Sequence, residues 1–176
     1  GWAANNATIS RYVETWGEIP AGVLSTTVPG VISALLAMLA NYGTMSFAEV
    51  IGPALHFAQQ GFPTYQLLNR AIGTQERLNN INKYPDSARI FLPEGSPPVL
   101  GSLFIQKDLA KTLSLMARAE EQAIEKGLKK ASGIQAARDA FYKGDIAHRM
   151  VESLEHLGAL YSYDDFAEYE SPMEEP

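Results

Sequence analysis

Three histidines, His56, His148 and His156, are the side chains of this sequence best suited to metal binding or acid–base chemistry. Two histidines four residues apart on a helix, with an acid between them, would set two metal ligands one turn apart, but no pair here has that spacing. His148 and His156 are eight residues apart, and so lie on the same side of one helix. The sequence predicts no metal site. We expect His148 and His156 at the surface and His56, beside Phe57, in the core or at its edge.

The run Ser25-Thr26-Thr27 supplies hydroxyl groups that resemble candidate nucleophiles. A hydroxyl nucleophile needs an adjacent base, or it must be a chain N-terminus whose own amine serves as the base. Neither arrangement is visible around these residues. We therefore expect extended structure or helix capping here.

Asp164 and Asp165 are neighbouring carboxylates of the kind that acid–base catalysis uses in pairs. Adjacent residues on a helix do not face each other, and acids are favoured at a helix N-terminus by the helix dipole. Capping is the better interpretation. The glycines occur singly and not as a phosphate-binding loop after a strand, so the sequence predicts no catalytic residue, no metal and no cofactor.

The composition fits a globular chain with a sizeable core, since 46% of the 176 residues are hydrophobic and 19% are charged. Cysteine is absent, which excludes disulfides, thiolate nucleophiles and cysteine zinc sites and leaves the cellular compartment open. The longest apolar stretch, residues 31–40, has about half of the ~20 residues that cross a membrane, so we expect no membrane span.

The net charge of −6 is concentrated in the C-terminal part of the sequence. Beyond Arg149 there is no Lys or Arg, and the eight acids are Glu152, Glu155, Asp164, Asp165, Glu168, Glu170, Glu174 and Glu175. Binding to nucleic acid needs clustered Lys and Arg that neutralise phosphates. The sequence therefore predicts no nucleic-acid partner.

Periodicity and capping signals predict a mainly α fold of six or seven helices joined by loops rich in Pro and Gly. We divide the sequence into an irregular or extended lead-in over residues 1–30, a helical domain over 31–170 and a frayed acidic tail over 171–176. The first 28 residues lack a clear helical period and contain at most a short strand.

The first half of the helical domain contains three predicted helices. Residues 31–41 are apolar on all sides, which predicts a helix buried on most of its surface. Ser46 and Glu49 form a capping box for a second helix to about residue 60, with Pro53 inside it. A third helix is predicted over 65–78, and residues 79–102, with four prolines, are predicted as loop.

The second half contains the stripe Ile105, Leu109, Leu113 and Met116, which predicts an amphipathic helix. Its charged continuation over 120–132 is expected to be solvated. Two further helices are predicted over 134–143 and 146–157, the second capped by Asp145. The inner face of this second helix is expected to be Ile146, Met150, Leu154 and Leu157. Ser162 to Asp165 resembles a capping box for a short last helix through Tyr169.

Four stretches, in this order, resemble the γ-glutamyltransferase (γ-glutamyltranspeptidase) family and together span nearly the whole chain. The first is Leu24-Ser25-Thr26-Thr27-Val28-Pro29-Gly30 with the later Tyr42-Gly43, Pro53-Ala54 and Ala58-Gln59-Gln60-Gly61-Phe62. The second is Phe91-Leu92-Pro93-Glu94-Gly95 with Gln106-Lys107-Asp108-Leu109-Ala110-Lys111-Thr112-Leu113. The third is Phe141-Tyr142-Lys143-Gly144-Asp145-Ile146-Ala147, and the fourth is Tyr161-Ser162-Tyr163-Asp164-Asp165-Phe166-Ala167-Glu168-Tyr169.

This resemblance implies a segment from inside the large subunit of an N-terminal-nucleophile hydrolase, which cleaves itself into a large and a small subunit. The nucleophilic Thr, the oxyanion hole and most substrate-binding groups of the family would then lie beyond Pro176. The implied partners are the remainder of the large subunit and the small subunit. A parent that follows the family would be periplasmic or extracellular.

One large-subunit residue of the family, an Arg that binds the α-carboxylate of the substrate, aligns with Trp2. The resemblance there rests on Gly1-Trp2-Ala3-Ala4 and Ala7-Thr8. With Trp2 at that position the parent lacks a bidentate carboxylate clamp. Other departures are Ala34 and Ala159 in place of family glycines, and roughly fifteen extra residues between Arg118 and Asp139, an insertion that costs little in a surface connection.

The competing interpretation is a freestanding helical module that binds a protein partner through its helices and acidic tail. Under the family interpretation, the chain alone is expected to be inactive. Its apolar helical faces are also expected to lack their usual cover, which predicts self-association.

Overall fold

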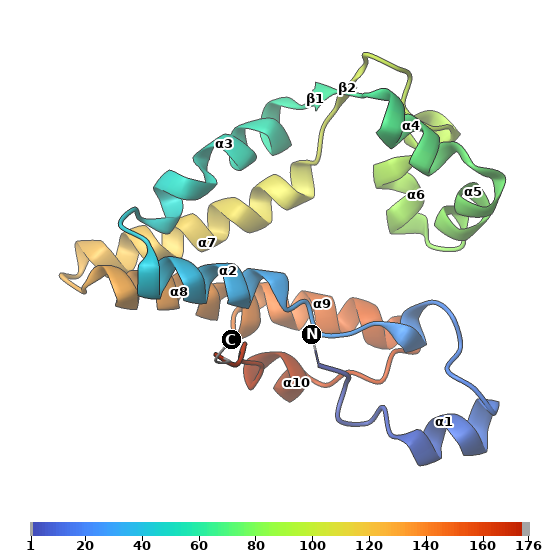
Figure 1. The fold of residues 1–176 in the computed structure, drawn as a ribbon, viewed down its shortest axis with the longest axis horizontal. Coiled ribbons are helices and arrows are strands. Elements are labelled where there is room, and N and C mark those ends of the chain that lie inside the picture. The colour runs from blue at the N-terminus through green and yellow to red at the C-terminus, as the bar shows by residue number, and fades with distance from the viewer. Residues whose placement is uncertain (1, 174–176) are drawn as a thin grey trace. The chain divides into compact units, whose positions relative to one another are not determined.

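The computed structural model describes residues 2–173, which are mainly helical (Figure 1). In chain order the elements are α1 (Ile9–Trp16), the 3₁₀ turn η1 (Val23–Ser25), α2 (Val31–Tyr42), α3 (Phe47–Gln60), β1 (Phe62–Pro63), α4 (Gln66–Gly73), α5 (Gln75–Asn82), α6 (Pro85–Phe91), the 3₁₀ turn η2 (Pro93–Gly95), β2 (Leu103–Phe104), α7 (Lys107–Glu125), α8 (Lys130–Tyr142), α9 (Asp145–His156) and α10 (Tyr163–Ala167). The mainly α fold class is confirmed, and the helices of residues 2–173 outnumber the six or seven expected.

The chain forms two compact units. Unit 1 combines the segment up to residue 51 with the segment from 114 onward, and unit 2 is residues 52–113. In unit 1, α2 and α9 both pack on α8, and α10 closes against α8 and α9 (Figure 1). The core is built on α8, where Ile134, Ala137, Phe141 and Tyr142 recur at helical spacing and are buried.

The N-terminal lead-in contains a helix, so its prediction as irregular was wrong. Thr8 caps α1, because its side chain accepts a hydrogen bond from the Arg11 N–H, and Gly17 ends it in a left-handed conformation. Ile9, Tyr12, Val13 and Trp16 follow the spacing of one helix face. That signal was present in the sequence, but it extends over only two turns.

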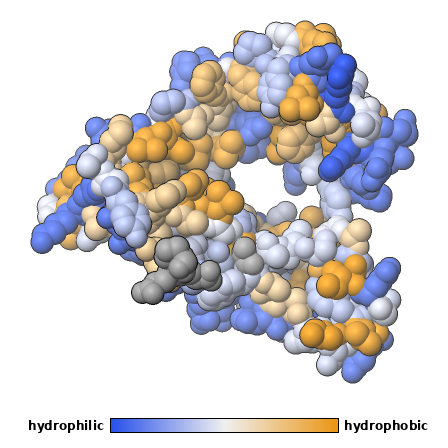
Figure 2. All heavy atoms as spheres, viewed as in Figure 1, coloured by the Kyte–Doolittle hydropathy of each residue, from blue (hydrophilic) through white to orange (hydrophobic). Residues whose placement is uncertain are grey.

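Helix α2 is less buried than its all-round apolar sequence predicted. Its buried residues are Ser33 and Leu36, whereas Val31, Leu35 and Met38 are exposed. Within unit 1 the helix packs mainly on α8, so one stripe is covered and the rest is not. Figure 2 shows apolar side chains gathered over α2 and the beginning of α3, and others over α1.

The N-terminus of α3 is capped twice. Ser46 and Glu49 form the predicted capping box, with the Ser46 N–H 2.8 Å from Glu49 Oε2 and the Glu49 N–H donating to Ser46 Oγ over 3.2 Å. In addition, Glu120 accepts hydrogen bonds from the N–H groups of Phe47 (2.8 Å) and Ala48 (2.7 Å). Glu120 is only 1% exposed, so its prediction as part of a solvated helical extension was wrong.

The extension itself is also shorter than predicted. Helix α7 ends at Glu125 and α8 begins at Lys130, because the chain reverses at Gly127, which has a φ of 83° that suits glycine. Of the predicted stripe, Leu113 and Met116 are buried, but Ile105 precedes α7 and Leu109 is exposed.

Helix α9 has the expected inner face only in part. Ile146 and Val151 are buried, but Leu157 is exposed because α9 ends at His156. Gly144, and not the predicted Asp145, stands at the N-cap position, and Asp145 lies in the first turn of the helix. The final helix, α10, has the predicted capping box between Ser162 and Asp165.

Unit 2 contains short helices and a two-stranded antiparallel sheet in which Phe62 pairs with Phe104. Thr74 is extended and caps α5, so the single helix predicted over 65–78 is two helices, α4 and α5. Helix α6 lies within the predicted loop over 79–102, with Pro85 in its first turn, where a missing N–H costs nothing.

No helix among residues 2–173 is both long and apolar enough to span a membrane. Part of the predicted frayed tail, residues 174–176, lies outside the described residues, as does Gly1.

Candidate functional site

Trp2, which the resemblance predicts at the position of the family's substrate-binding arginine, lies at the surface of unit 1 and is 52% exposed. Hydrogen bonds hold the backbone of Trp2 and of the stretch that follows it. The Trp2 carbonyl accepts a hydrogen bond from the Val28 N–H over 2.8 Å, and the Asn5 N–H donates to Asp165 Oδ1 over 2.7 Å. The N-terminal stretch that carries Trp2 is thereby attached to α10 and to the Val28-Pro29-Gly30 turn.

A row of aromatic rings supports the indole of Trp2. The Tyr169 ring meets the indole edge-to-face, with the centroids 5.3 Å apart. The Tyr142 ring stacks on Tyr169 with the centroids 5.5 Å apart. The Arg138 guanidinium carbon lies 5.0 Å from the centroid of the Tyr142 ring, which is a cation–π distance. We call Arg138, Tyr142, Tyr169 and Trp2 the aromatic row.

The buried end of this row is held by polar contacts. The Tyr142 hydroxyl donates to the Pro29 carbonyl and accepts from the Ser33 N–H over 3.1 Å. Arg138 donates to the Tyr169 carbonyl and lies 3.4 Å from Ser33 Oγ. Burial raises the pKa of Tyr142, because the phenolate would lose its hydration there. The hydroxyl therefore stays protonated at neutral pH and acts as a structural donor.

The hydroxyl run at 25–27 shows no nucleophilic arrangement. Ser25 Oγ donates to the Gly22 carbonyl over 2.9 Å and Thr26 Oγ1 to the Val23 carbonyl over 2.7 Å. Both hydroxyls bond to carbonyls of the η1 segment, which was not predicted, whereas Thr26 itself is extended, as expected.

The structure places all three histidines at exposed positions. His148 and His156 are exposed, as predicted, and the imidazole of His148 stacks on the Tyr163 ring at a centroid distance of 4.2 Å. His56 is also exposed, so its predicted place in the core or at its edge was wrong; it lies on the outer side of α3. Within residues 2–173 no three His, Asp or Glu side chains come close enough together to hold a metal ion.

Of the two neighbouring carboxylates, Asp165 is buried and Asp164 is exposed. Asp165 Oδ2 accepts the Ser162 N–H over 2.7 Å and closes the capping box. Its other oxygen holds the Asn5 N–H. Both oxygens are thus occupied by backbone donors, which is a structural role and not acid–base chemistry.

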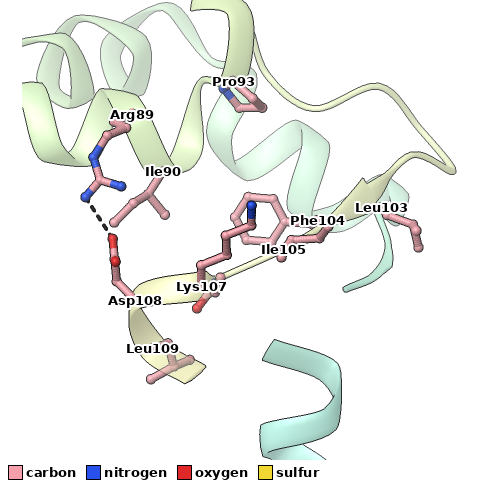
Figure 3. Close-up of a pocket in the computed structure, with 10 residues that line it drawn as sticks. Arg89, Ile90, Pro93, Leu103, Phe104, Ile105, Lys107, Asp108 and Leu109 are labelled. Atoms are coloured by element: carbon pink, nitrogen blue, oxygen red, sulfur yellow. Dashed lines mark ion pairs between the residues drawn. The ribbon is translucent and has the colours of Figure 1, made fainter. Parts of the chain in front are cut away.

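Unit 2 has a separate hollow of about 430 Å³ at the start of α7 (Figure 3). Apolar side chains such as Phe104 and Ile105 line it, and Arg89, Lys107 and Asp108 stand around it. Arg89 pairs with Asp108 at 2.9 Å and with Asp86 at 3.4 Å. The hydrogen bond that Arg89 donates to the Asp108 carboxylate raises the pKa of Arg89. The hollow holds no nucleophile with a base, and its arginine is already paired.

Sequence reasoning missed Arg138, Tyr142 and Glu120 as residues that shape this site and unit. A signal existed for Arg138, which lies four residues after Ile134 and four before Tyr142, on the apolar face of its helix. A charge at such a position is expected to have a partner. Nothing in the local sequence identifies that partner, the Tyr169 carbonyl.

Comparison with known proteins places the fold and the motifs in one family. The chain is 37% identical over 140 residues to the glutathione hydrolase-like YwrD proenzyme of Bacillus subtilis, an alignment that covers 80% of this chain and 23% of that protein. It is 28% identical over 155 residues to the acylase ACY 1 proenzyme of a Pseudomonas species, covering 88% of this chain and 24% of that one. The chain thus spans about a quarter of the length of these curated relatives.

A solved structure extends this likeness to the fold. The γ-glutamyltranspeptidase of Helicobacter pylori superposes with a TM-score of 0.76 over 96% of this chain and 44% of that one, at 24% sequence identity. The model of the gamma-glutamyltranspeptidase family matches residues 1–176. The resemblance inferred from four motifs is confirmed, and the chain belongs to the gamma-glutamyltranspeptidase family.

Proposed function

We propose that this chain is the helical part of the large subunit of a γ-glutamyltransferase-like hydrolase, and that it does not catalyse the reaction by itself. The observation that carries the proposal is the family match over residues 1–176, in a chain whose described hydroxyls at 25–26 are engaged by backbone carbonyls and have no adjacent base. An N-terminal-nucleophile reaction needs a hydroxyl with a free amine beside it. In this proposal the nucleophile belongs to the small subunit.

The proposed partners are the remainder of the large subunit and the small subunit. The share of the curated relatives that the chain matches, 23% of the first, supports this. Residues 31–170 are the proposed helical domain that packs against those partners, and the segment over 1–30 is the part that brings Trp2 to them. A freestanding interaction module is not favoured, because the family model accounts for the whole chain.

The proposed substrate is an amide whose acyl part need not carry the free α-carboxylate of a γ-glutamyl group. Trp2 donates no bidentate pair of hydrogen bonds to a carboxylate, as an arginine would. The one cation of the aromatic row, Arg138, is 8% exposed and is engaged by Tyr169 and Ser33. One of the proteins similar to this chain is named an acylase, which supports a substrate other than a γ-glutamyl compound.

The test of inactivity is an assay of the purified chain with a chromogenic γ-glutamyl anilide, with a glutathione hydrolase of Bacillus subtilis as positive control. We expect no release of the aniline above the buffer rate. Turnover by the chain that disappears when Thr26 is changed to Ala would overturn the proposal.

We also propose that the chain alone self-associates through the apolar surface of α2 and the start of α3. Leu35, Met38, Tyr42 and Val50 are exposed there around a shallow hollow of about 440 Å³. Monomeric proteins rarely leave large contiguous apolar patches uncovered. Salt is expected to tighten the assembly, because it screens the repulsion between chains of net charge −6.

Sedimentation at micromolar concentration tests the association. The Leu35→Glu variant is expected to shift the chain toward monomer, whereas Leu67→Glu, a matched change at another exposed leucine, is expected to leave it associated. If the unsubstituted chain were monomeric and bound no apolar dye, self-association would be refuted and the family assignment would stand.

A further inference from the structure

Trp2 differs from an ordinary exposed aromatic residue because its environment fixes it. The backbone is held by the Val28 N–H on the Trp2 carbonyl and by Asp165 on the Asn5 N–H. About half of the residue remains exposed. The other tryptophan, Trp16, is 38% exposed at the end of α1 and contacts one ring, Tyr12, at 5.6 Å. Trp2, by contrast, is the exposed end of the aromatic row.

The row beneath Trp2 runs into the core of unit 1. Tyr169 and Tyr142 are 4% and 0% exposed, respectively, so neither ring has room to turn away. Arg138 fixes both tyrosines, because it lies over the Tyr142 ring and donates to the Tyr169 carbonyl. The orientation of an exposed indole is therefore set from inside the helical core.

A fixed and half-exposed indole favours planar apolar partners. Aromatic pairs prefer offset or edge-to-face contacts, and a ring that is already ordered loses little entropy when it binds. Two polar groups of the row are engaged within unit 1, since the Tyr142 hydroxyl is bonded to Pro29 and Ser33 and Arg138 donates to the Tyr169 carbonyl. A carboxylate at Trp2 would meet only the single indole Nε1–H and no bidentate pair of donors.

We propose that Trp2 is a preset stacking platform for the aromatic acyl group of an amide substrate, with Tyr169, Tyr142 and Arg138 as its positioning residues. The assignment of the ring to a substrate's acyl part rests on the proposed function. The binding of an aromatic amide by Trp2 does not depend on it.

The test follows the indole Nε1–H resonance of Trp2 by NMR in the Trp16→Phe chain, which leaves one tryptophan. The probe is phenylacetamide, compared with acetamide and with L-glutamine. We expect phenylacetamide to shift the resonance in a saturable way, at least about fivefold more tightly than acetamide, and L-glutamine to shift it no more than acetamide does. A shift with L-glutamine as large as with phenylacetamide would refute the platform and favour recognition of a carboxylate and amine.

Variants in the row separate positioning from simple exposure. Tyr169→Leu and Arg138→Met are expected to raise acrylamide quenching of Trp2 fluorescence and to abolish the phenylacetamide shift. Tyr169→Phe, which keeps the ring, is expected to leave the quenching and the shift as they are in the unsubstituted chain. Far-ultraviolet circular dichroism identifies variants that remain folded. An undiminished shift in folded Tyr169→Leu would refute the positioning role.

The two proposals fail separately. If the chain hydrolysed the γ-glutamyl anilide, the proposed function would fall while a phenylacetamide shift would still establish the platform. If no aromatic amide perturbed Trp2 in the folded chain, the platform would fall and the family assignment would stand.

Discussion

Unit 1 and unit 2 hold their helices together by different means. Unit 1 has a core cluster that joins residues from both ends of the sequence, including Leu36, Met116 and Phe166, and buried polar bonds that cross 73 residues at Phe47–Glu120 and 105 residues at Ser33–Arg138. Unit 2 has local contacts, such as Thr74 capping α5 and Lys83 bonding to Asn80, and its long-range contacts cross fewer residues, as in the β1–β2 pairing and the Asn69–Pro98 bond across 29 residues. Its ion pairs are exposed.

Because their contacts differ, the two units should differ in how much stability a single substitution removes. A buried contact between distant segments is lost together with the packing around it, whereas an exposed local contact is replaced by water at little cost. We therefore expect large effects in unit 1 and small ones in unit 2.

The largest effect is expected for Phe166→Ala in unit 1. Phe166 is fully buried and meets Tyr161 edge-to-face at 5.6 Å, so its removal leaves a cavity and should lower the free energy of unfolding by about 3–5 kcal/mol. Urea unfolding followed by circular dichroism measures the loss. Leu103→Ala in unit 2, where the leucine is 62% exposed, is the control and should change little. Equal losses in the two variants would remove the contrast.

The second effect concerns the remote cap of α3. In Glu120→Gln a neutral amide replaces the carboxylate, and only one of its two terminal groups can accept a hydrogen bond from Phe47 or Ala48. One buried N–H loses its partner, and we expect a destabilisation of about 1–3 kcal/mol. Hydrogen exchange of these two amides should accelerate. The neighbouring change Glu121→Gln, at an exposed position, should affect neither amide.

A smaller effect is expected for Tyr142→Phe, about 1 kcal/mol at neutral pH, because the hydroxyl bonds to Pro29 and Ser33 are lost. The pKa of Tyr142 is raised above its ordinary 10.0 by burial. The unfolded chain therefore loses this proton first, so the contribution to stability is constant below pH 10 and falls as pH rises above it.

Urea unfolding at about pH 8 and about pH 11 measures that dependence. Tyr142→Phe should lose less stability between the two values than the parent. Burial also raises the pKa of Tyr161, so some dependence should persist in Tyr142→Phe. If Tyr142→Phe lost as much stability between the two pH values as the unsubstituted chain, Tyr142 would not contribute to the pH dependence.

The smallest effect is expected for Arg89→Ala in unit 2. Arg89 is paired with Asp86 and Asp108, but its side chain is 60% exposed. Surface pairs of this kind contribute little to stability and are weakened by salt. We expect little change in the urea midpoint in low salt and none in high salt. A destabilisation that exceeds that of Glu120→Gln would reverse the contrast between the units.

Local signals predicted the elements that local chemistry decides. The capping boxes at Ser46 and Ser162 formed as expected because each needs only residues three positions apart. The sequence did not predict α1 because its apolar face is only two turns long. The break between α4 and α5 was not predicted because a threonine such as Thr74, which caps α5, also occurs inside helices.

Burial was predicted less well than helicity. Glu120 belongs to a charged segment that looks solvated, and its partners are the backbone of a segment more than 70 residues away. Exposure of Leu35 on α2 and of Leu109 on α7 is likewise a property of what packs nearby and not of the sequence period. For the site, family motifs drew attention to Trp2, but the rings beneath it come from the other end of the chain.

The double cap of α3 has a consequence for the order of folding. The Ser46–Glu49 box spans three residues and can close as soon as the first turn forms, whereas the Glu120 bonds must close a loop of more than 70 residues, at an entropic cost that grows with the logarithm of loop length. The start of α3 therefore acquires its two caps at different times. In a φ-value experiment, substitutions at Ser46 should affect the folding rate, and substitutions at Glu120 should mainly affect unfolding. One helix terminus would then report separately on local helix formation and on the later docking of α7.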